Sequence, residues 1–298
     1  LPVANAMMVA SSHWLQVLAD IAVAVAAEKG IAAPVDGNAT PEAQAIAKSL
    51  LGGERKAVLL GNAAAHHAQA SGLLGLANWI AAQTGASVGY LTEAANTVGA
   101  QLAGAMPGKG GLNAGQMLAG ALKAVLLLNT EPARDSAAGA AAVQNLGKAE
   151  MVVTLSPFKA NMEFSDVLLP IAPFTETPGT FVNAEGRVQS FHAVVKPLAE
   201  TRPAWKVLRV LANMLDLPGF AYESAQDVLA GMHQASGGVP AQVSVSALNN
   251  AANLPTDLSA AAGAPVVAGI YQLDGIVRRA PSLQLTADAR LVVQEAQA

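Results

Sequence analysis

The sequence predicts an α/β fold, in which a doubly wound, mainly parallel sheet has helices on both faces. Two observations lead to this prediction. Short, continuous apolar runs such as Ala57–Leu60 and Ala124–Leu128 alternate with helical patterns, as is typical of parallel strands buried on both faces. A pair of strand-like runs flanks Ala184-Glu185-Gly186, where the glycine favours a tight hairpin. We therefore expect the parallel sheet to be followed by a short hairpin and then by an irregular C-terminal tail.

The first 52 residues contain two predicted helices. Trp14, Leu18, Ile21 and Val25 recur at helical spacing and predict a helix from about residue 12 to 27. A second helix is expected over residues 41–51, because Pro41 suits the first helical turn. We interpret residues 1–52 as a helical remnant of a preceding domain.

Residues 53–220 form the predicted α/β domain. Its parallel strands are expected at residues 57–60, 86–91, 124–128, 151–155 and 167–169, and its hairpin strands at 180–183 and 187–191. Helices are expected at residues 68–84, 94–102, 136–147 and 203–215. From residue 221 the pattern is less regular, so we interpret 221–298 as a C-terminal extension packed on the domain.

Composition excludes several classes of function. The chain has 298 residues, a net charge of −4 and no basic run, so we expect no nucleic-acid partner. It contains no cysteine, which rules out disulfides and cysteine-ligated iron–sulfur clusters within this chain. The most apolar helical candidate, Ile21–Ala27, is far below the roughly 20 residues that cross a bilayer, so no direct membrane insertion is expected.

Two further features bear on assembly. Only 13% of the residues are charged, against about 25% in typical soluble domains. Either the alanine-rich composition is a bias of the sequence, or part of the surface is covered by other subunits, since charges are depleted at interface cores. The chain begins with Leu1-Pro2 rather than methionine, and we expect it to be a soluble piece of a longer polypeptide, cut inside a domain.

The glycine turns are weak candidates for phosphate binding. Gly61-Asn62 follows a predicted strand and precedes a helix, where backbone N–H groups can bind phosphate. An ordinary turn is the alternative, because no glycine fingerprint of a nucleotide site is present. The run from Gly108 to Gly111 lacks the spacing of a phosphate-binding loop and is expected to be a plain loop.

Charged residues and histidines give three more candidates. Glu131, Arg134 and Asp135 come just after a predicted strand, where they either contact a ligand or form ion pairs within a loop. Glu176, Glu185 and Arg187 flank the hairpin, and we expect an internal ion pair to hold its turn. His66-His67 is the only adjacent histidine pair. The remaining histidines are scattered, so we expect a structural role and no metal site.

An ordered set of residues carries a resemblance to a known family. Ser165–Pro170 reads SDVLLP and is followed by Glu176, Gly179-Thr180, Asn183 and the run EGRVQ from Glu185 to Gln189. This order resembles a signature of the molybdopterin oxidoreductase family. Pro203–Leu208 resembles the next helix of that family, and Gly61 with His67 and Gly72 resembles the turn of its pterin-binding domain. The resemblance covers about residues 55–220.

Two features resemble one branch of the family, the large subunits of bacterial NADH–quinone oxidoreductase, or respiratory complex I. The tail from Tyr271 to Gln284 contains VRRAPSLQ, which is similar to the C-terminus of those subunits. The strand end Asn129-Thr130-Glu131-Pro132 departs from the G-x-N-P pattern of cofactor-binding members. The resemblance implies a structural part of an oxidoreductase that lacks catalytic residues, cofactor and metal.

The same resemblance implies a setting for the chain. Iron–sulfur clusters are expected in the region that precedes it. Its partners are expected to be other subunits of the peripheral arm, on the cytoplasmic side of the bacterial inner membrane, in a complex that carries electrons from NADH to quinone. Whether this chain belongs to a catalytic unit stays open at this point.

Two alternatives also remain. The first is part of a genuine molybdenum enzyme of the formate dehydrogenase or nitrate reductase type. In that case Asn62, Glu131, Asn183 and Arg187 would line a pterin guanine dinucleotide. The second is a free-standing α/β module that binds nucleotides, which the missing phosphate fingerprint disfavours.

Overall fold

The computed structural model describes residues 3–235, 251–261 and 268–290. The chain divides into two compact units. Unit 1 comprises Leu1–Ala94 with Ser244–Val267, and unit 2 comprises Ala95–Val243 with Ala268–Ala298. These boundaries follow contacts, so the domains proposed from sequence at 1–52, 53–220 and 221–298 stay a prediction.

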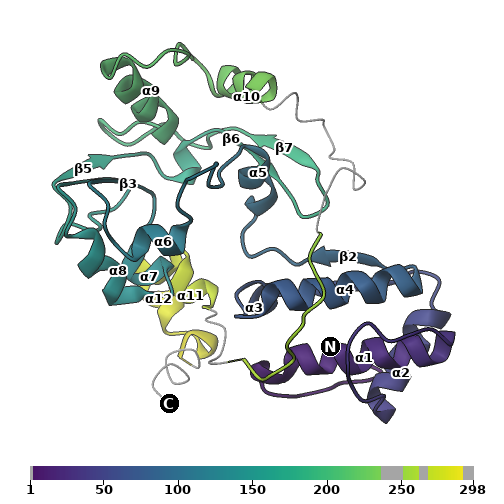
Figure 1. The fold of residues 1–298 in the computed structure, drawn as a ribbon. Helices are drawn as coiled ribbons and strands as arrows, with labels where there is room; N and C mark the ends of the chain where they lie inside the picture. Colours follow the sequence, from purple (N-terminus) through teal and green to yellow (C-terminus); the bar gives the residue numbers. More distant parts are fainter. Residues whose placement is uncertain (1–2, 236–250, 262–267, 291–298) are drawn as a thin grey trace. The chain divides into compact units, whose positions relative to one another are not determined.

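Unit 1 contains helices and two parallel strands, and α4 packs on both strands (Figure 1). Strands β1 and β2 pair in register from Ala57 with Ser87 to Leu60 with Tyr90. Its elements are η1 (Ser11–His13), α1 (Trp14–Lys29), α2 (Pro41–Gly52), β1 (Ala57–Leu60), α3 (Asn62–Ala65), α4 (Ala70–Thr84) and β2 (Ser87–Tyr90).

The core of unit 1 lies where α1 packs on α2 and α4. Leu15 and Val25 of α1 meet Leu73, Leu76 and Ile80 of α4, and all five side chains are almost completely buried. Alanines fill much of the remaining helix contact, and their small side chains allow the helix axes to approach closely. Each fully buried Leu or Ile side chain contributes about 1.5–3 kcal/mol of apolar transfer free energy.

A later segment, residues 251–261, belongs to the same unit and runs along α4 (Figure 1). The backbone of Asn253 passes so close to Gly75 that a Cβ there would collide with it. Leu258 packs against the core, and the N–H of Ala261 donates to the carbonyl of Ser12 over 3.1 Å. The segment is therefore held by backbone and apolar contacts.

Unit 2 contains a parallel sheet in the order β3-β4-β5 and a separate antiparallel hairpin, β6-β7. Leu127 lies opposite Thr154 on β4, and Thr154 lies opposite Leu168 on β5. The strands are β3 (Ala124–Leu128), β4 (Met151–Ser156), β5 (Val167–Pro170), β6 (Gly179–Val182) and β7 (Val188–Phe191). The helices are α5 (Thr97–Leu102), α6 (Ala114–Leu118), α7 (Pro132–Asp135), α8 (Gly139–Leu146), η2 (Phe174–Glu176), α9 (Ala204–Met214), α10 (Ala225–Ala235), α11 (Ile270–Leu273), η4 (Val277–Arg279) and α12 (Pro281–Gln284).

The core of unit 2 is smaller and centres on β4. Val152 of β4 packs with Val125 and Leu127 of β3 and with Leu146 of α8. Within this sheet only the central strand has both edges paired, which explains why most of its side chains are buried while both neighbours have more exposed positions. This sheet sets the position of the strand ends described below.

The predicted α/β fold class is confirmed, and each predicted strand lies within two residues of an observed one. Two expectations need correction. Among the described residues the parallel strands form two separate sheets instead of one. The region after residue 221 is not irregular throughout, because it contains α10, α11, η4 and α12. The start of α10 carries a sequence signal, since Ser224 and Asp227 hydrogen-bond each other's backbone N–H groups as a reciprocal cap.

Helices in the described part of the chain are all too short or too polar to span a membrane.

Candidate functional site

The carboxyl ends of β3, β4 and β5 border a cavity of about 460 Å³ in unit 2. Parallel strands place these ends at one edge of the sheet, where open α/β sheets bind ligands. The lining comes from the residues that follow each strand, including Asn129, Ser156 and Ile171. The far side is lined by a tail segment, residues 269–284, which supplies Ile276 and Arg278.

The turn after β3 brings two carboxylates to this edge. The strand stops at Leu128, and Asn129 takes a left-handed conformation with φ of 50°, which asparagine tolerates better than most residues. Pro132 then opens the short helix α7. Asp135 at its end accepts the backbone N–H of Glu131 over 2.7 Å. The loop therefore positions Glu131 and Asp135 together.

The tail segment 269–284 is folded by its own hydrogen bonds. Asp274 accepts the N–H groups of Ile276 and Val277 over 2.9 and 2.8 Å and so holds the first turn of η4. The side-chain amide of Gln284 donates to the carbonyls of Tyr271 and Val277 over 3.0 and 2.9 Å. This local fold fixes the helical turn that carries the two arginines of VRRAPSLQ.

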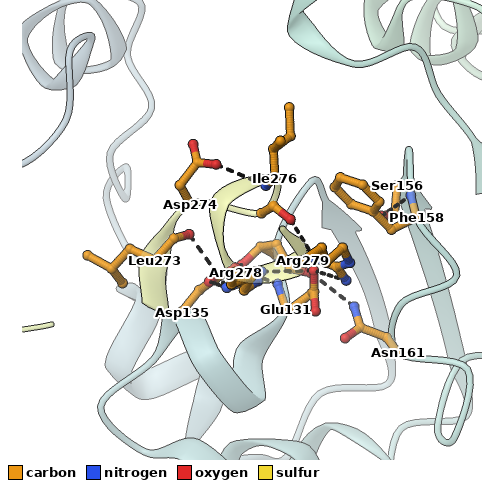
Figure 2. A network of polar contacts seen from close by, with 12 residues as sticks. Glu131, Asp135, Ser156, Phe158, Asn161, Leu273, Asp274, Ile276, Arg278 and Arg279 are labelled. Carbon is orange, nitrogen blue, oxygen red and sulfur yellow. Dashed lines mark hydrogen bonds and ion pairs between the residues drawn. The ribbon is translucent and has the colours of Figure 1, made fainter. Parts of the chain in front are cut away.

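Arg278 bridges the two carboxylates (Figure 2). Its guanidinium nitrogens lie 2.8 Å from Glu131 Oε1 and 2.7 Å from Asp135 Oδ1. The Arg278 side chain is only 7% exposed, and burial alone opposes its charged form. The hydrogen bonds and charges of Asp135 and Glu131 outweigh that effect, so the pKa of Arg278 lies above its ordinary value.

Arg279 adds a second cation to Glu131. Its Nη2 lies 2.7 Å from Glu131 Oε1, and its guanidinium carbon lies 4.0 Å from the ring centre of Phe158, which follows β4. Asn161 donates to the carbonyl of Thr130 over 2.9 Å and ties the loop after β4 to the loop after β3. The loops at this edge and the tail segment are thus linked by contacts within the chain (Figure 2).

Glu131 and Asp135 differ from Arg134 in their contacts. Glu131 and Asp135 take part in ion pairs, and both contact the tail arginines. Arg134 belongs to none of the ion pairs among the described residues. The two carboxylates are therefore ion-paired with the tail segment and not within their own loop. Their cationic partners do not follow from local sequence, although they belong to the VRR run that carries the family resemblance.

Gly61-Asn62 connects β1 to the four-residue helix α3, which begins at Asn62. The neighbouring hollow of about 280 Å³ is lined mainly by apolar side chains such as Trp14, Leu18 and Leu60. No side chain caps α3. Asn62 lies in unit 1, whereas the other three candidates lie in unit 2.

Asn183 holds the hairpin turn, and this corrects the predicted ion pair. Its Oδ1 accepts the N–H groups of Glu185 and Arg187 over 3.0 and 2.9 Å. The carboxylate of Glu176 instead accepts the N–H of Leu198 over 2.9 Å. Among the described residues no ion pair joins Glu176 or Glu185 to Arg187. A short asparagine side chain satisfies the turn without ordering two long charged side chains.

The two histidines have separate structural contacts. His67 is buried and stacks on Trp14, its Nδ1 accepts from the N–H of Gln69, and its Nε2 lies 3.0 Å from the carbonyl of Ser11. These contacts assign the proton to Nε2. His66 lies 2.9 Å from Glu93. Within the described ranges, no three His, Asp or Glu side chains cluster in a way that could hold a metal ion.

Residues 30–214 match the family model described as molybdopterin oxidoreductase. This chain belongs to the molybdopterin oxidoreductase family. Local matches to curated relatives agree with the assignment. One is a probable oxidoreductase of Bacillus subtilis, YjgC, with 42% identity over 67 residues, which is 22% of this chain and 7% of that protein.

A second match is a putative formate dehydrogenase of Staphylococcus aureus strain RF122, SAB2186c, with 46% identity over 52 residues, or 17% of this chain and 5% of that protein. The corresponding protein of strain MRSA252, SAR2393, is 42% identical over 52 residues, with the same coverage. The matched stretches span only a small part of each relative.

The lining of the strand-end cavity does not fit a pterin dinucleotide, whose pyrophosphate needs cations or free N–H donors. Glu131 is committed to both arginines, and Asn183 is committed to its own turn. The cavity lining carries three carboxylates, from Glu131, Asp135 and Asp274, against Arg278 as its only cation among the described residues. The cavity lining therefore offers no site for the pyrophosphate of that cofactor.

Proposed function

We propose that this chain is a structural, cofactor-free part of the large subunit of a bacterial NADH–quinone oxidoreductase. The single observation that carries the proposal is the bridge from Arg278 to Glu131 and Asp135. The bridge places the guanidinium of Arg278 at the sheet edge where other α/β proteins bind ligands. Its arginine comes from the VRRAPSLQ run, which resembles the C-terminus of those subunits.

The proposed role does not require redox chemistry from this chain. The sequence has no cysteine. The electrons that the complex carries from NADH to quinone would therefore pass through iron–sulfur clusters held elsewhere in the large subunit. The chain supplies a folded support, and its partners are other subunits of the peripheral arm. We place it on the cytoplasmic side of the bacterial inner membrane as part of a membrane-attached complex.

The test uses the full-length protein, tagged and purified from its own host. We expect the other subunits of NADH–quinone oxidoreductase to co-purify with it. Arg278→Ala should lower the yield of assembled complex while leaving NADH–quinone turnover per assembled complex unchanged. Failure to co-purify with those subunits would contradict the proposal. A loss of turnover in fully assembled complex would contradict a purely structural role.

The names of the relatives favour a second candidate, a molybdenum enzyme that acts on formate. Under this alternative Asn62, Glu131, Asn183 and Arg187 would bind a pterin guanine dinucleotide. Arg187 has an exposed side chain, so Arg187→Ala tests binding with little effect on folding. Formate-dependent dye reduction by the full-length protein, lost in Arg187→Ala, would support this candidate. No formate-dependent reduction would remove it.

A further inference from the structure

Helix α9 has one broad apolar face, and much of it is not buried. Trp205, Leu208 and Ala212 form the stripe expected from sequence, and Ala212 is buried. The expected fourth member, Leu215, is 62% exposed, because α9 ends at Met214. Of the residues of α9, only Ala212 is therefore buried.

A second stripe on the same apolar face carries Val207, Val210, Leu211 and Met214, spaced at i, i+3, i+4 and i+7. Val210 is 46% exposed and Met214 is 78% exposed. A helix that faces only water normally shows polar residues on its outer side. This second stripe therefore has the pattern of a helix face that meets a partner.

The stripe forms one wall of a groove of about 550 Å³. The opposite wall includes Leu169 of β5, which is an edge strand of its sheet. The relative position of β5 and α9 is fixed by backbone contact, since Ile171 bridges to Arg202 and the N–H of Ala172 donates to the carbonyl of Arg202 over 2.9 Å. The groove is therefore a built feature of unit 2.

The charges around the groove favour an acidic occupant. Arg202, Lys206 and Arg209 line it, against one carboxylate, Glu223. No ion pair among the described residues involves any of these three cations. In addition, Arg209 has a buried Nε atom without a hydrogen-bond partner. These features contrast with the net negative charge of the chain.

We propose that the groove between β5 and α9 docks an acidic amphipathic helix of a neighbouring protein chain. The apolar side of that helix covers the stripe from Val207 to Met214, and its carboxylates pair with Arg202 and Lys206. This inference rests on the proposed structural role, because it names the kind of subunit surface that holds the chain in its assembly. The chain's own residues 236–250 contain no charged side chain and so cannot supply these carboxylates.

The experiment places photoreactive p-benzoylphenylalanine at position 210 of the full-length protein in its native host. The same substitution at Met162, which is exposed in a loop of unit 2, is the control. After irradiation and mass spectrometry, we expect position 210 to cross-link to another chain, at a segment with apolar residues at helical spacing and flanking Asp or Glu. Met162 should not cross-link to that segment.

A charge reversal tests the selectivity of the groove. Lys206→Glu should lower the cross-linking yield at position 210 by at least about tenfold, because like charges then face each other. Lys159→Glu makes the same change of charge at an exposed site outside the groove and should leave the yield within about twofold, as expected for a remote, screened charge.

Cross-links within this chain, to a second copy of it, or to a segment without carboxylates would overturn the docking proposal, as would the absence of any cross-link. If one of these results is found and NADH–quinone oxidoreductase subunits still co-purify, the docking proposal fails while the proposed function stands. If an acidic helix is captured from an unrelated complex, the docking proposal stands and the proposed function fails.

Discussion

Two segments from the last part of the chain dock on the two units in different ways. Residues 251–261 lie on unit 1 through backbone and apolar contacts, with Asn253 passing Gly75. Residues 269–284 dock on unit 2 through ion pairs, with Arg278 and Arg279 reaching Glu131 and Asp135. The first mode depends on shape, whereas the second depends on charge.

This difference has consequences for stability and for sequence. The apolar and backbone contacts that hold segment 251–261 are insensitive to salt. They require only a small residue where the two backbones approach each other, as at Gly75. Charged docking in a partly buried place is costly to disrupt, because removing one partner leaves the other charge without compensation. It also requires particular side chains, which explains why segment 269–284 has a recognisable motif while 251–261 has none.

The largest effect is expected from Arg278→Ala. It leaves Glu131 with one cation and Asp135 with none, and both carboxylates are mostly buried. We expect the free energy of local opening of segment 269–284 to fall by about 3 kcal/mol. Amide hydrogen exchange at Ile276 and Val277 should then speed up roughly 100-fold. The control is Arg187→Ala, at an exposed side chain. Equal exchange rates in both variants would show that the bridge does not hold the segment.

Gly75→Ala tests the docking in unit 1. A Cβ at this position collides with the backbone of Asn253. Overpacking costs about 1–3 kcal/mol, and alanine's helix preference offsets about 1 kcal/mol of that. We expect a net loss of about 1–2 kcal/mol in the free energy of unfolding, measured by urea denaturation. Gly52→Ala, where nothing lies within reach, should not destabilise the protein. An unchanged stability of Gly75→Ala would contradict the close approach.

Arg279→Ala should have a smaller effect than Arg278→Ala. Its side chain is one-third exposed, it pairs with Glu131 alone, and it lies over the Phe158 ring. We expect the free energy of local opening of segment 269–284 to fall by about 1 kcal/mol, because the ion pair and the cation–π contact are both removed. The loss should shrink at high salt, since exposed charges are screened. Hydrogen exchange of segment 269–284 at low and high salt measures both values. A loss as large as that of Arg278→Ala would reverse the assigned roles.

The smallest effect concerns Asp257 in segment 251–261. Its carboxylate accepts hydrogen bonds from the N–H and hydroxyl of Ser259, which lower its pKa. Because the folded pKa lies below the unfolded value of about 3.9, the contribution is present above that pH and is lost as the pH falls through the folded pKa. An NMR titration should show the low midpoint, and Ser259→Ala should move it upward. A midpoint unaffected by Ser259→Ala would rule out this cause.

Most of the fold follows from local signals in the sequence. The strands of both units are apolar runs bounded by Gly, Asn or Pro, as at Leu60-Gly61 and Leu128-Asn129. Their grouping into two sheets does not follow, because a buried parallel strand carries no mark of which neighbour it pairs with. The short helices after residue 269 escape prediction because four-residue helices leave no measurable periodicity.

The candidate site could be predicted only in part. The position of Glu131 and Asp135 after a strand indicates their place and allows for an ion-paired loop. Their partner Arg278 lies 143 residues from Asp135 in sequence, and no local pattern predicts such a contact. The hairpin is predicted correctly, but the expected ion pair of Arg187 is not found. The short side chain of Asn183 instead accepts the backbone N–H groups of the turn.

We propose that the arginines of the tail segment take the place of a pterin at the strand ends of unit 2. The most direct measurement is molybdenum by elemental analysis, together with pterin fluorescence after denaturation, on the full-length protein purified from its host. The account predicts neither in stoichiometric amount, both for the wild type and for Arg278→Ala. Stoichiometric molybdenum or pterin in the wild type would contradict it.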